Sequence, residues 1–201
     1  MRGDPDLGQL PALVAFAFVS SVTPGPNNTV LWASGAQFGV RATLPHVIGT
    51  SLGIGAMAAA VAGGLGVLVT NFPAAELVLK AAGSLYLLYL AYQMGVSGAI
   101  HRPEVARPLS LGQAMVFQCL NPKAWIFVLA AVSAFRPADL PIAIGSALII
   151  MTMMLVVLPT AAAWAAGGTF ISRLITSDRA RRTLSVGLAV LLAATVVDLW
   201  L

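Results

Sequence analysis

Two proline-containing segments interrupt apolar runs of this sequence and hold much of its polar chemistry. They are Thr23-Pro24-Gly25-Pro26-Asn27-Asn28 and Asn121-Pro122-Lys123. Proline has no N–H and its ring clashes with the preceding turn, so both segments are predicted to break a helix. Each break would leave backbone carbonyls without a partner, and we expect these to be the carbonyls of Ser20, Val22 and Gln118.

Each interruption also has the residue pattern of a helix start. Asn121 is suited to cap a helix whose first residue is Pro122, with Lys123 just inside, and Asn27 and Asn28 can do similar work at the first break. Two helices that begin near the middle of a membrane would point N–H groups and positive dipole ends into a shared cavity. Such a cavity would suit a carboxylate or another small anion.

The elements that must position these residues are membrane spans. The chain has 201 residues, of which 59% are hydrophobic and 9% charged, whereas a soluble domain has about 25% charged residues. Residues 7–40, 42–75 and 140–172 contain no charge, and a helix needs about 20 residues to cross a bilayer. We predict an all-α integral membrane protein with six transmembrane helices, near 9–34, 43–69, 74–97, 110–135, 139–167 and 182–201.

Several function classes are excluded by composition and spacing. The spans leave only short connections, so residues 1–201 are predicted to form a single transmembrane domain without a soluble catalytic part, and we expect no enzyme activity. Cys119 is the single cysteine, and His46 and His101 are far apart, so we expect no disulfide, no metal and no cofactor. The scattered basic residues predict no nucleic-acid partner. The first apolar segment lacks a cleavage motif and is expected to be retained.

The two halves of the chain show a related pattern. Pro26 and Pro122 each lie inside the first span of a half, and each is followed at the helix end by a solitary arginine, Arg41 or Arg136. Three spans separate the interruptions, and because this number is odd the second half would be inverted in the membrane. We predict two inverted three-helix repeats, about 9–97 and about 110–201.

The arginine-rich loop from Arg173 to Arg182 is predicted in the cytoplasm, which puts both termini outside.

Two titratable residues could carry a coupled proton. They are His46 in the second span and Asp198 in the last. A buried structural histidine is the simpler interpretation of His46, and Asp198 has a similar ambiguity.

Tyrosines and glycines at helical spacing give weaker signals. Tyr86, Tyr89 and Tyr92 share one helix face, which favours bundle core or an interfacial belt over substrate stacking. The pairs Gly35 with Gly39 and Gly49 with Gly53 allow close helix approach, which favours packing within the chain over the seam of a homodimer.

The ordered motifs resemble the LysE/RhtB family of bacterial amino-acid exporters over nearly the whole chain. The resemblance rests on Thr23 to Asn27, Gly39-Val40-Arg41, Gly49 to Gly53, Lys80-x-x-Gly83-x-x-Tyr86, and Leu120 to Ala124. It implies export of amino acids or their derivatives across the inner membrane, driven by the proton gradient. Thr43 stands where a glycine is common and Pro45-His46 departs from the pattern, so the substrate is expected to differ from lysine, arginine, threonine or homoserine.

The residues and the resemblance together predict an alternating-access exporter in the bacterial inner membrane, with an amino acid and membrane lipid as its partners. Asn27, Asn28, Asn121 and Lys123 would contact the substrate, and the break residues Thr23, Pro24, Gly25, Pro26 and Pro122 would shape or gate the site. No acidic residue accompanies these motifs, which favours a neutral amino acid. A membrane scaffold, a channel and a membrane oxidoreductase are the alternatives, and Lys123 has a snorkelling structural role as its own alternative.

Overall fold

The regular elements of the protein are helices throughout the described part of the chain. The computed structural model describes residues 9–66, 73–97, 107–137, 139–175 and 177–200. The helices are α1 (Leu10–Val22), α2 (Pro26–Ala60) with its π-helical continuation η2 (Val61–Leu65), α4 (Pro73–Ser97), α5 (Leu111–Cys119), α6 (Pro122–Ala134), α7 (Ile142–Leu174) and α8 (Asp178–Trp200). The all-α prediction is therefore confirmed for these residues.

Helix length and composition support a membrane protein. Two helices of the described part are long and apolar enough to cross a membrane, Pro26–Leu65 and Ile142–Leu174, and a third is added if α5 and α6 count as one bent span. The helices Leu10–Val22 and Arg182–Val197 are apolar but shorter. The total of six spans therefore stays a prediction, although α4 closely matches the predicted third span.

The first predicted span is split by the first break. α1 ends at Val22, and α2 begins at Pro26 and runs to Ala60 with a kink at Gly39, whose φ of 81° favours glycine. Gly39 is non-helical, with ψ 165°, so two helical stretches meet at this kink, and it lies between the predicted spans 9–34 and 43–69. Thr43 holds this bend, because its Oγ1 donates to the Gly39 carbonyl at 2.9 Å and lies 2.9 Å from Ser34 Oγ.

The second break has the predicted geometry, while the first differs. α5 and α6 are bent by 74°, with Pro122 at the start of α6 and the Asn121 side chain accepting the Lys123 N–H at 3.2 Å. At the first break the N-cap is Gly25, which has no side-chain hydrogen bond. Asn27 and Asn28 lie inside the first turn of α2, so the prediction that they cap this helix is wrong.

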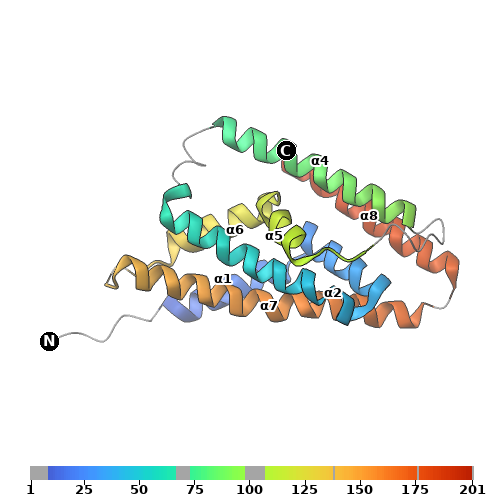
Figure 1. The fold of residues 1–201 in the computed structure, drawn as a ribbon, viewed down its shortest axis with the longest axis horizontal. Helices are drawn as coiled ribbons and strands as arrows, with labels where there is room; N and C mark the ends of the chain where they lie inside the picture. Colours follow the sequence, from blue (N-terminus) through green and yellow to red (C-terminus); the bar gives the residue numbers. More distant parts are fainter. Residues whose placement is uncertain (1–8, 67–72, 98–106, 138, 176, 201) are drawn as a thin grey trace.

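Two pairs of helices run together and enclose the breaks. α2 packs along α7, and α4 packs along α8, with α5 against α2 (Figure 1). The α2–α7 contact is close, because a Cβ added at Gly35 would meet the backbone of Ala165. A Cβ at Gly49 would likewise meet the Leu111 carbonyl and lie 2.7 Å from Ala114 Cβ. Gly35 and Gly49 therefore pack within the chain, as the sequence favours. They give no evidence for the seam of a homodimer.

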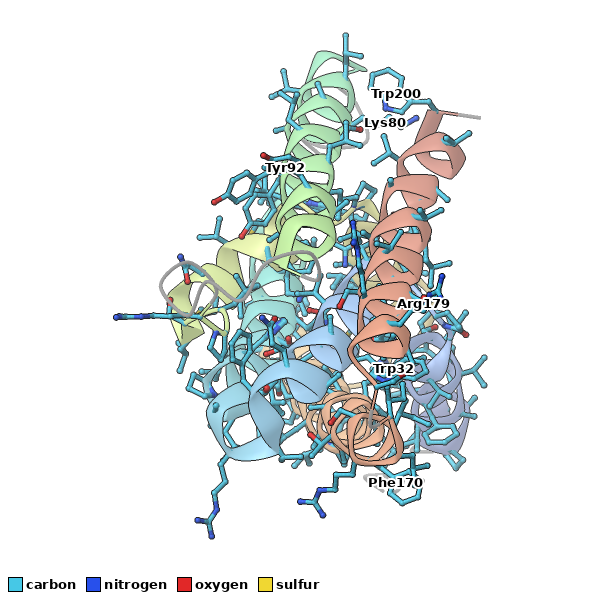
Figure 2. The ribbon with its side chains drawn as sticks, turned by 90° about the vertical axis from the view of Figure 1, so that its right-hand side faces the viewer. Trp32, Lys80, Tyr92, Phe170, Arg179 and Trp200 are labelled. Carbon is cyan, nitrogen blue, oxygen red and sulfur yellow. The ribbon has the colours of Figure 1, made fainter. Side chains whose placement is uncertain are left out.

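Large apolar side chains cover the outside of the bundle. Several are more than half exposed, among them Phe18, Leu85, Ile126, Leu155 and Phe170. Phe170 and Tyr92 point away from the helices in Figure 2. An apolar exterior of this kind fits a surface in contact with lipid.

Candidate functional site

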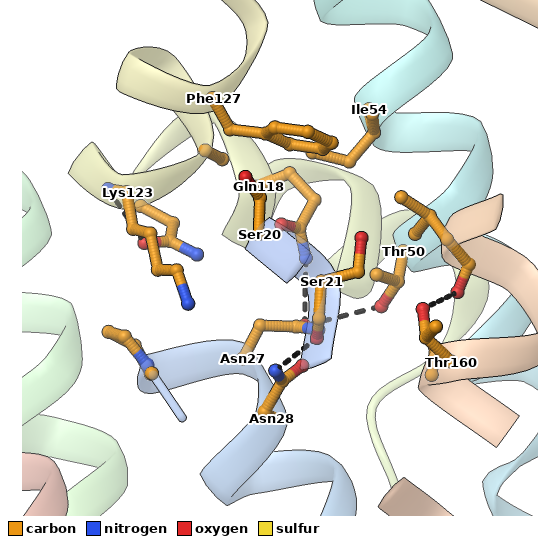
Figure 3. Close-up of a pocket in the computed structure, with 16 residues that line it drawn as sticks. Ser20, Ser21, Asn27, Asn28, Thr50, Ile54, Gln118, Lys123, Phe127 and Thr160 are labelled. Carbon is orange, nitrogen blue, oxygen red and sulfur yellow. Dashed lines mark hydrogen bonds between the residues drawn. The ribbon is translucent and has the colours of Figure 1, made fainter. Parts of the chain in front are cut away.

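A small polar cavity lies where the two breaks meet. Its volume is about 50 Å³, and its walls include all four residues that the sequence predicts to bind substrate, Asn27, Asn28, Asn121 and Lys123. Gly25 and Pro26 of the first break line it as well. Figure 3 shows Asn27, Asn28 and Lys123 around this space. The structure thus brings together two segments that are almost one hundred residues apart in sequence.

Further polar residues, which sequence reasoning missed, line the cavity. Ser20 and Ser21 come from the end of α1, Thr50 from the part of α2 after the kink, Gln118 from α5 and Thr160 from α7. Gln118 and Thr50 are 2% and 3% exposed, so they are buried polar groups inside apolar helices. Their polarity within apolar runs is the signal that could have identified them.

The side-chain carbonyl of Asn27 is the centre of a buried hydrogen-bond network. Asn27 Oδ1 accepts from Gln118 Nε2 at 2.8 Å and from Thr50 Oγ1 at 3.2 Å, and it lies 3.3 Å from His46 Nε2. A carbonyl oxygen has two lone pairs, so these groups fully occupy it. No described residue accepts a hydrogen bond from Asn27 Nδ2, which leaves this donor for the cavity.

His46 is fully buried and contacts the cavity through Asn27. For its Nε2 to donate to Asn27 Oδ1, Nε2 must carry the ring proton in neutral imidazole, which leaves Nδ1 as an acceptor. Nδ1 is buried and has no hydrogen-bond partner among the described residues. The residue that departs from the family pattern is therefore linked directly to the predicted substrate site.

Side chains cover the carbonyls of the first break. Asn28 Nδ2 donates to the carbonyl of Ser21 at 2.7 Å and to that of Thr23 at 3.0 Å. Lys123 Nζ donates to the carbonyls of Thr23, at 2.7 Å, and of Pro24, at 3.2 Å. The carbonyls that receive these side chains are thus not the predicted ones of Ser20 and Val22.

The second break keeps its own carbonyl occupied. The carbonyl of Gln118 accepts the N–H of Asn121 at 3.1 Å in a tight turn, so the prediction that Pro122 leaves this carbonyl free is wrong. Gly83 of α4 packs against this turn, because a Cβ at Gly83 would collide with the Leu120 carbonyl. A glycine of the resemblance motif therefore has a defined packing role at the break.

The remaining sequence candidates lie elsewhere. Tyr86 packs on Phe117 with ring centroids 5.5 Å apart, Tyr89 and Tyr92 are exposed, and none of the three lines the cavity. The core interpretation is therefore confirmed for Tyr86, and an interfacial belt stays a prediction for Tyr89 and Tyr92. Asp198 belongs to α8, but its side chain lies outside the described residues.

Comparison with known proteins gives a consistent picture. The family model described as LysE type translocator matches residues 18–201. Proteins named cysteine/O-acetylserine efflux protein from Escherichia coli (strain K12), Shigella sonnei (strain Ss046) and Shigella flexneri are each 29% identical to this chain over 126 residues. The match covers 63% of this chain and 65% of each relative's length. No solved structure matches.

Proposed function

Because the chain belongs to the LysE type translocator family, we propose that it is a secondary active exporter of a small neutral amino acid or amino-acid derivative. The observation that supports this proposal is the polar cavity between the two helix breaks. The relatives are named for efflux of cysteine and O-acetylserine, whose side chains are small and uncharged. We propose substrates of this class for the present chain.

The cavity has complementary ends for a zwitterion. The starts of α2 and α6 line it, and helix N-termini favour an anion such as the α-carboxylate. Asn27 Nδ2 adds a neutral donor, and Lys123 adds positive charge. The end of α1 presents carbonyls that suit the α-ammonium. The described lining contains no Asp or Glu to pair with a cationic side chain, which supports a neutral substrate.

The size of the cavity supports a mechanism in which the protein opens. A volume of about 50 Å³ holds only a few water molecules. An amino acid needs more room, so we propose that the cavity opens alternately to the two sides of the membrane. The proposed repeats, about 9–97 and 110–201, would move against each other along α2–α7 and α4–α8, since each pair joins one helix from either half.

We further propose that proton movement accompanies export and that His46 carries the proton. Its unpartnered Nδ1 is a buried acceptor, and its Nε2 contacts Asn27 in the cavity wall. Protonation would place a charge beside the substrate site and thereby change its affinity for the substrate. Asp198 is the second proposed carrier.

We propose that the protein lies in the bacterial inner membrane with both termini outside. The bend of α2 and the junction of α7 with α8 lie at the same right-hand end of Figure 1. Arg41 follows this bend, and Arg173, Arg179 and Arg182 lie near the junction. The positive-inside rule assigns that end to the cytoplasm. Periplasmic accessibility of tags at both termini would support this orientation, and cytoplasmic tags would reverse it.

The experiment that tests the function is counterflow of a radiolabelled amino-acid panel, including cysteine and O-acetylserine, in proteoliposomes. Wild type is compared with Lys123→Ala and with Tyr92→Phe, an exposed position outside the cavity, as the matched control. Saturable exchange that Lys123→Ala loses and Tyr92→Phe keeps would support the exporter. Linear flux without counterflow would indicate a channel, and no exchange by folded protein would favour a scaffold.

A further inference from the structure

The ammonium of Lys123 lies on the carboxyl-terminal end of α1. Its Nζ is 2.7 Å from the Thr23 carbonyl and 3.2 Å from the Pro24 carbonyl. Both carbonyls lie just beyond the last helical residue, Val22, next to the negative end of the helix dipole. This end of α1 is therefore a cation subsite at the edge of the cavity, next to its lining residues Gly25 and Lys123.

The neighbouring residues give this subsite its shape. Asn28 Nδ2 donates to the Thr23 carbonyl at 3.0 Å and so fixes its direction. Gly25 supplies the space, because a Cβ at this position would lie 2.9 Å from Lys123 Cδ and 3.2 Å from Nζ. An ammonium has three donors, and the two carbonyls occupy two of them.

We infer that Lys123 occupies the subsite of the substrate's own ammonium, and that a bound amino acid replaces it there and pairs its carboxylate with the released lysine. This inference rests on the proposed function and adds to it a chemical requirement for both charged groups of the substrate. Before the exchange the ammonium of Lys123 has only the dipoles of the two carbonyls as partners. After the exchange the substrate ammonium has the carbonyls and Lys123 has the carboxylate, so both cations keep a partner.

Compounds with only one of these groups fail in different ways. An amine without a carboxylate would displace Lys123 and leave two ammonium groups in one small cavity, where like charges repel strongly. A carboxylate whose amino group is acetylated could attract Lys123 but would leave the carbonyls of Thr23 and Pro24 without an ammonium donor, so the charge-assisted hydrogen bonds at this subsite would be lost. The exchange therefore selects for substrates with a free α-amino group and a free α-carboxyl group. This requirement does not depend on the side chain of the substrate.

Release of Lys123 would also loosen the contact between the two breaks. Lys123 belongs to the first turn of α6 and its partners belong to the end of α1, so the hydrogen bonds tie one helix start to another helix end. The cavity of about 50 Å³ must widen to accept an amino acid. Binding of the zwitterion therefore removes a direct connection between the two breaks.

The test compares cysteine with two analogues that each lack one charge, cysteamine and N-acetylcysteine, as inhibitors of labelled cysteine counterflow. In wild type, unlabelled cysteine should inhibit at concentrations at least about tenfold lower than either analogue, since each charge-assisted hydrogen bond contributes about a factor of ten or more. Comparable inhibition by cysteamine would overturn the inference. Absence of counterflow for every amino acid of the panel would instead overturn the proposed function.

The variant Lys123→Met should change the binding of cysteamine and of cysteine in opposite directions. It keeps the unbranched side chain but vacates the carbonyls of Thr23 and Pro24, so binding of labelled cysteamine to purified protein should rise at least about tenfold while cysteine binding falls. Thr169→Val is the matched control, because it removes another side-chain bond to a carbonyl, the 2.7 Å bond to Gly35, away from the cavity. The control should bind both compounds as wild type does. Folded Lys123→Met that binds no more cysteamine than the control would overturn the inference.

Discussion

Replacement of Asn27 by leucine tests whether the buried network around this residue holds α2 and α5 together. Leucine has the same branching at Cγ but no acceptor, so it removes the partner of Gln118 Nε2 and of His46 Nε2. Thr50 is less affected, because its Oγ1 also donates to the His46 carbonyl at 3.0 Å. The substitution therefore leaves two buried donors without an acceptor.

The exposure of these donors decides the size of the effect. A buried donor that loses its partner costs about 1–3 kcal/mol, so two of them predict a loss of about 2–6 kcal/mol of folding free energy. Hydrogen bonds between membrane helices contribute only about 0.6 kcal/mol on average, because polar groups often find new partners. Gln118 is 2% exposed and His46 is fully buried, so both donors are shielded from bulk solvent and the larger figure applies.

Thermal unfolding of the purified protein in detergent measures this loss, with Thr50→Val as the matched control. Thr50→Val removes one donor from Asn27 Oδ1 and leaves Gln118 and His46 to fill its two lone pairs, so it should cost at most about 1 kcal/mol. At about 2–4 °C per kcal/mol, Asn27→Leu should lower Tm by at least about 4 °C. Equal Tm values for the two variants would refute the network as a stabilising element.

Three further substitutions test the breaks and the coupling. Pro122→Ala should insert normally but lower counterflow by about tenfold or more, because it permits a straight α5–α6 helix, and an unchanged rate would remove the broken-helix argument. Gly83→Ala should lower the free energy of unfolding by about 1–3 kcal/mol in thermal unfolding, because its Cβ would collide with the Leu120 carbonyl. The control Gly112→Ala, whose Cβ meets open space, should not lower it. Equal losses for the two variants would contradict this packing. His46→Gln should keep counterflow yet lose uptake driven by a pH gradient in proteoliposomes, and retained pH-driven uptake would exclude His46 as the proton carrier.

Local chemistry explains the parts of the fold that the sequence predicts well. The second break follows from Asn121 and Pro122, because a cap and a proline act on their own neighbours and need no other helix. Pro24 and Pro26 locate the first break correctly, but Gly25 caps the helix there instead of an asparagine. The kink at Gly39 lies between the predicted spans 9–34 and 43–69, because glycine readily adopts the positive φ that the kink requires.

The composition and the two proline segments by themselves determined a helical membrane protein with a polar centre. Lipid cannot hydrogen-bond the backbone, so apolar runs form helices and irregular backbone must lie within the protein. Only the tertiary structure decided which groups meet in that centre. Lys123 contacts carbonyls about one hundred residues earlier in the chain, and Gln118 binds Asn27 from α5. These pairings depend on the close packing of α1, α2, α5 and α6, which the spacing of residues along the chain does not specify.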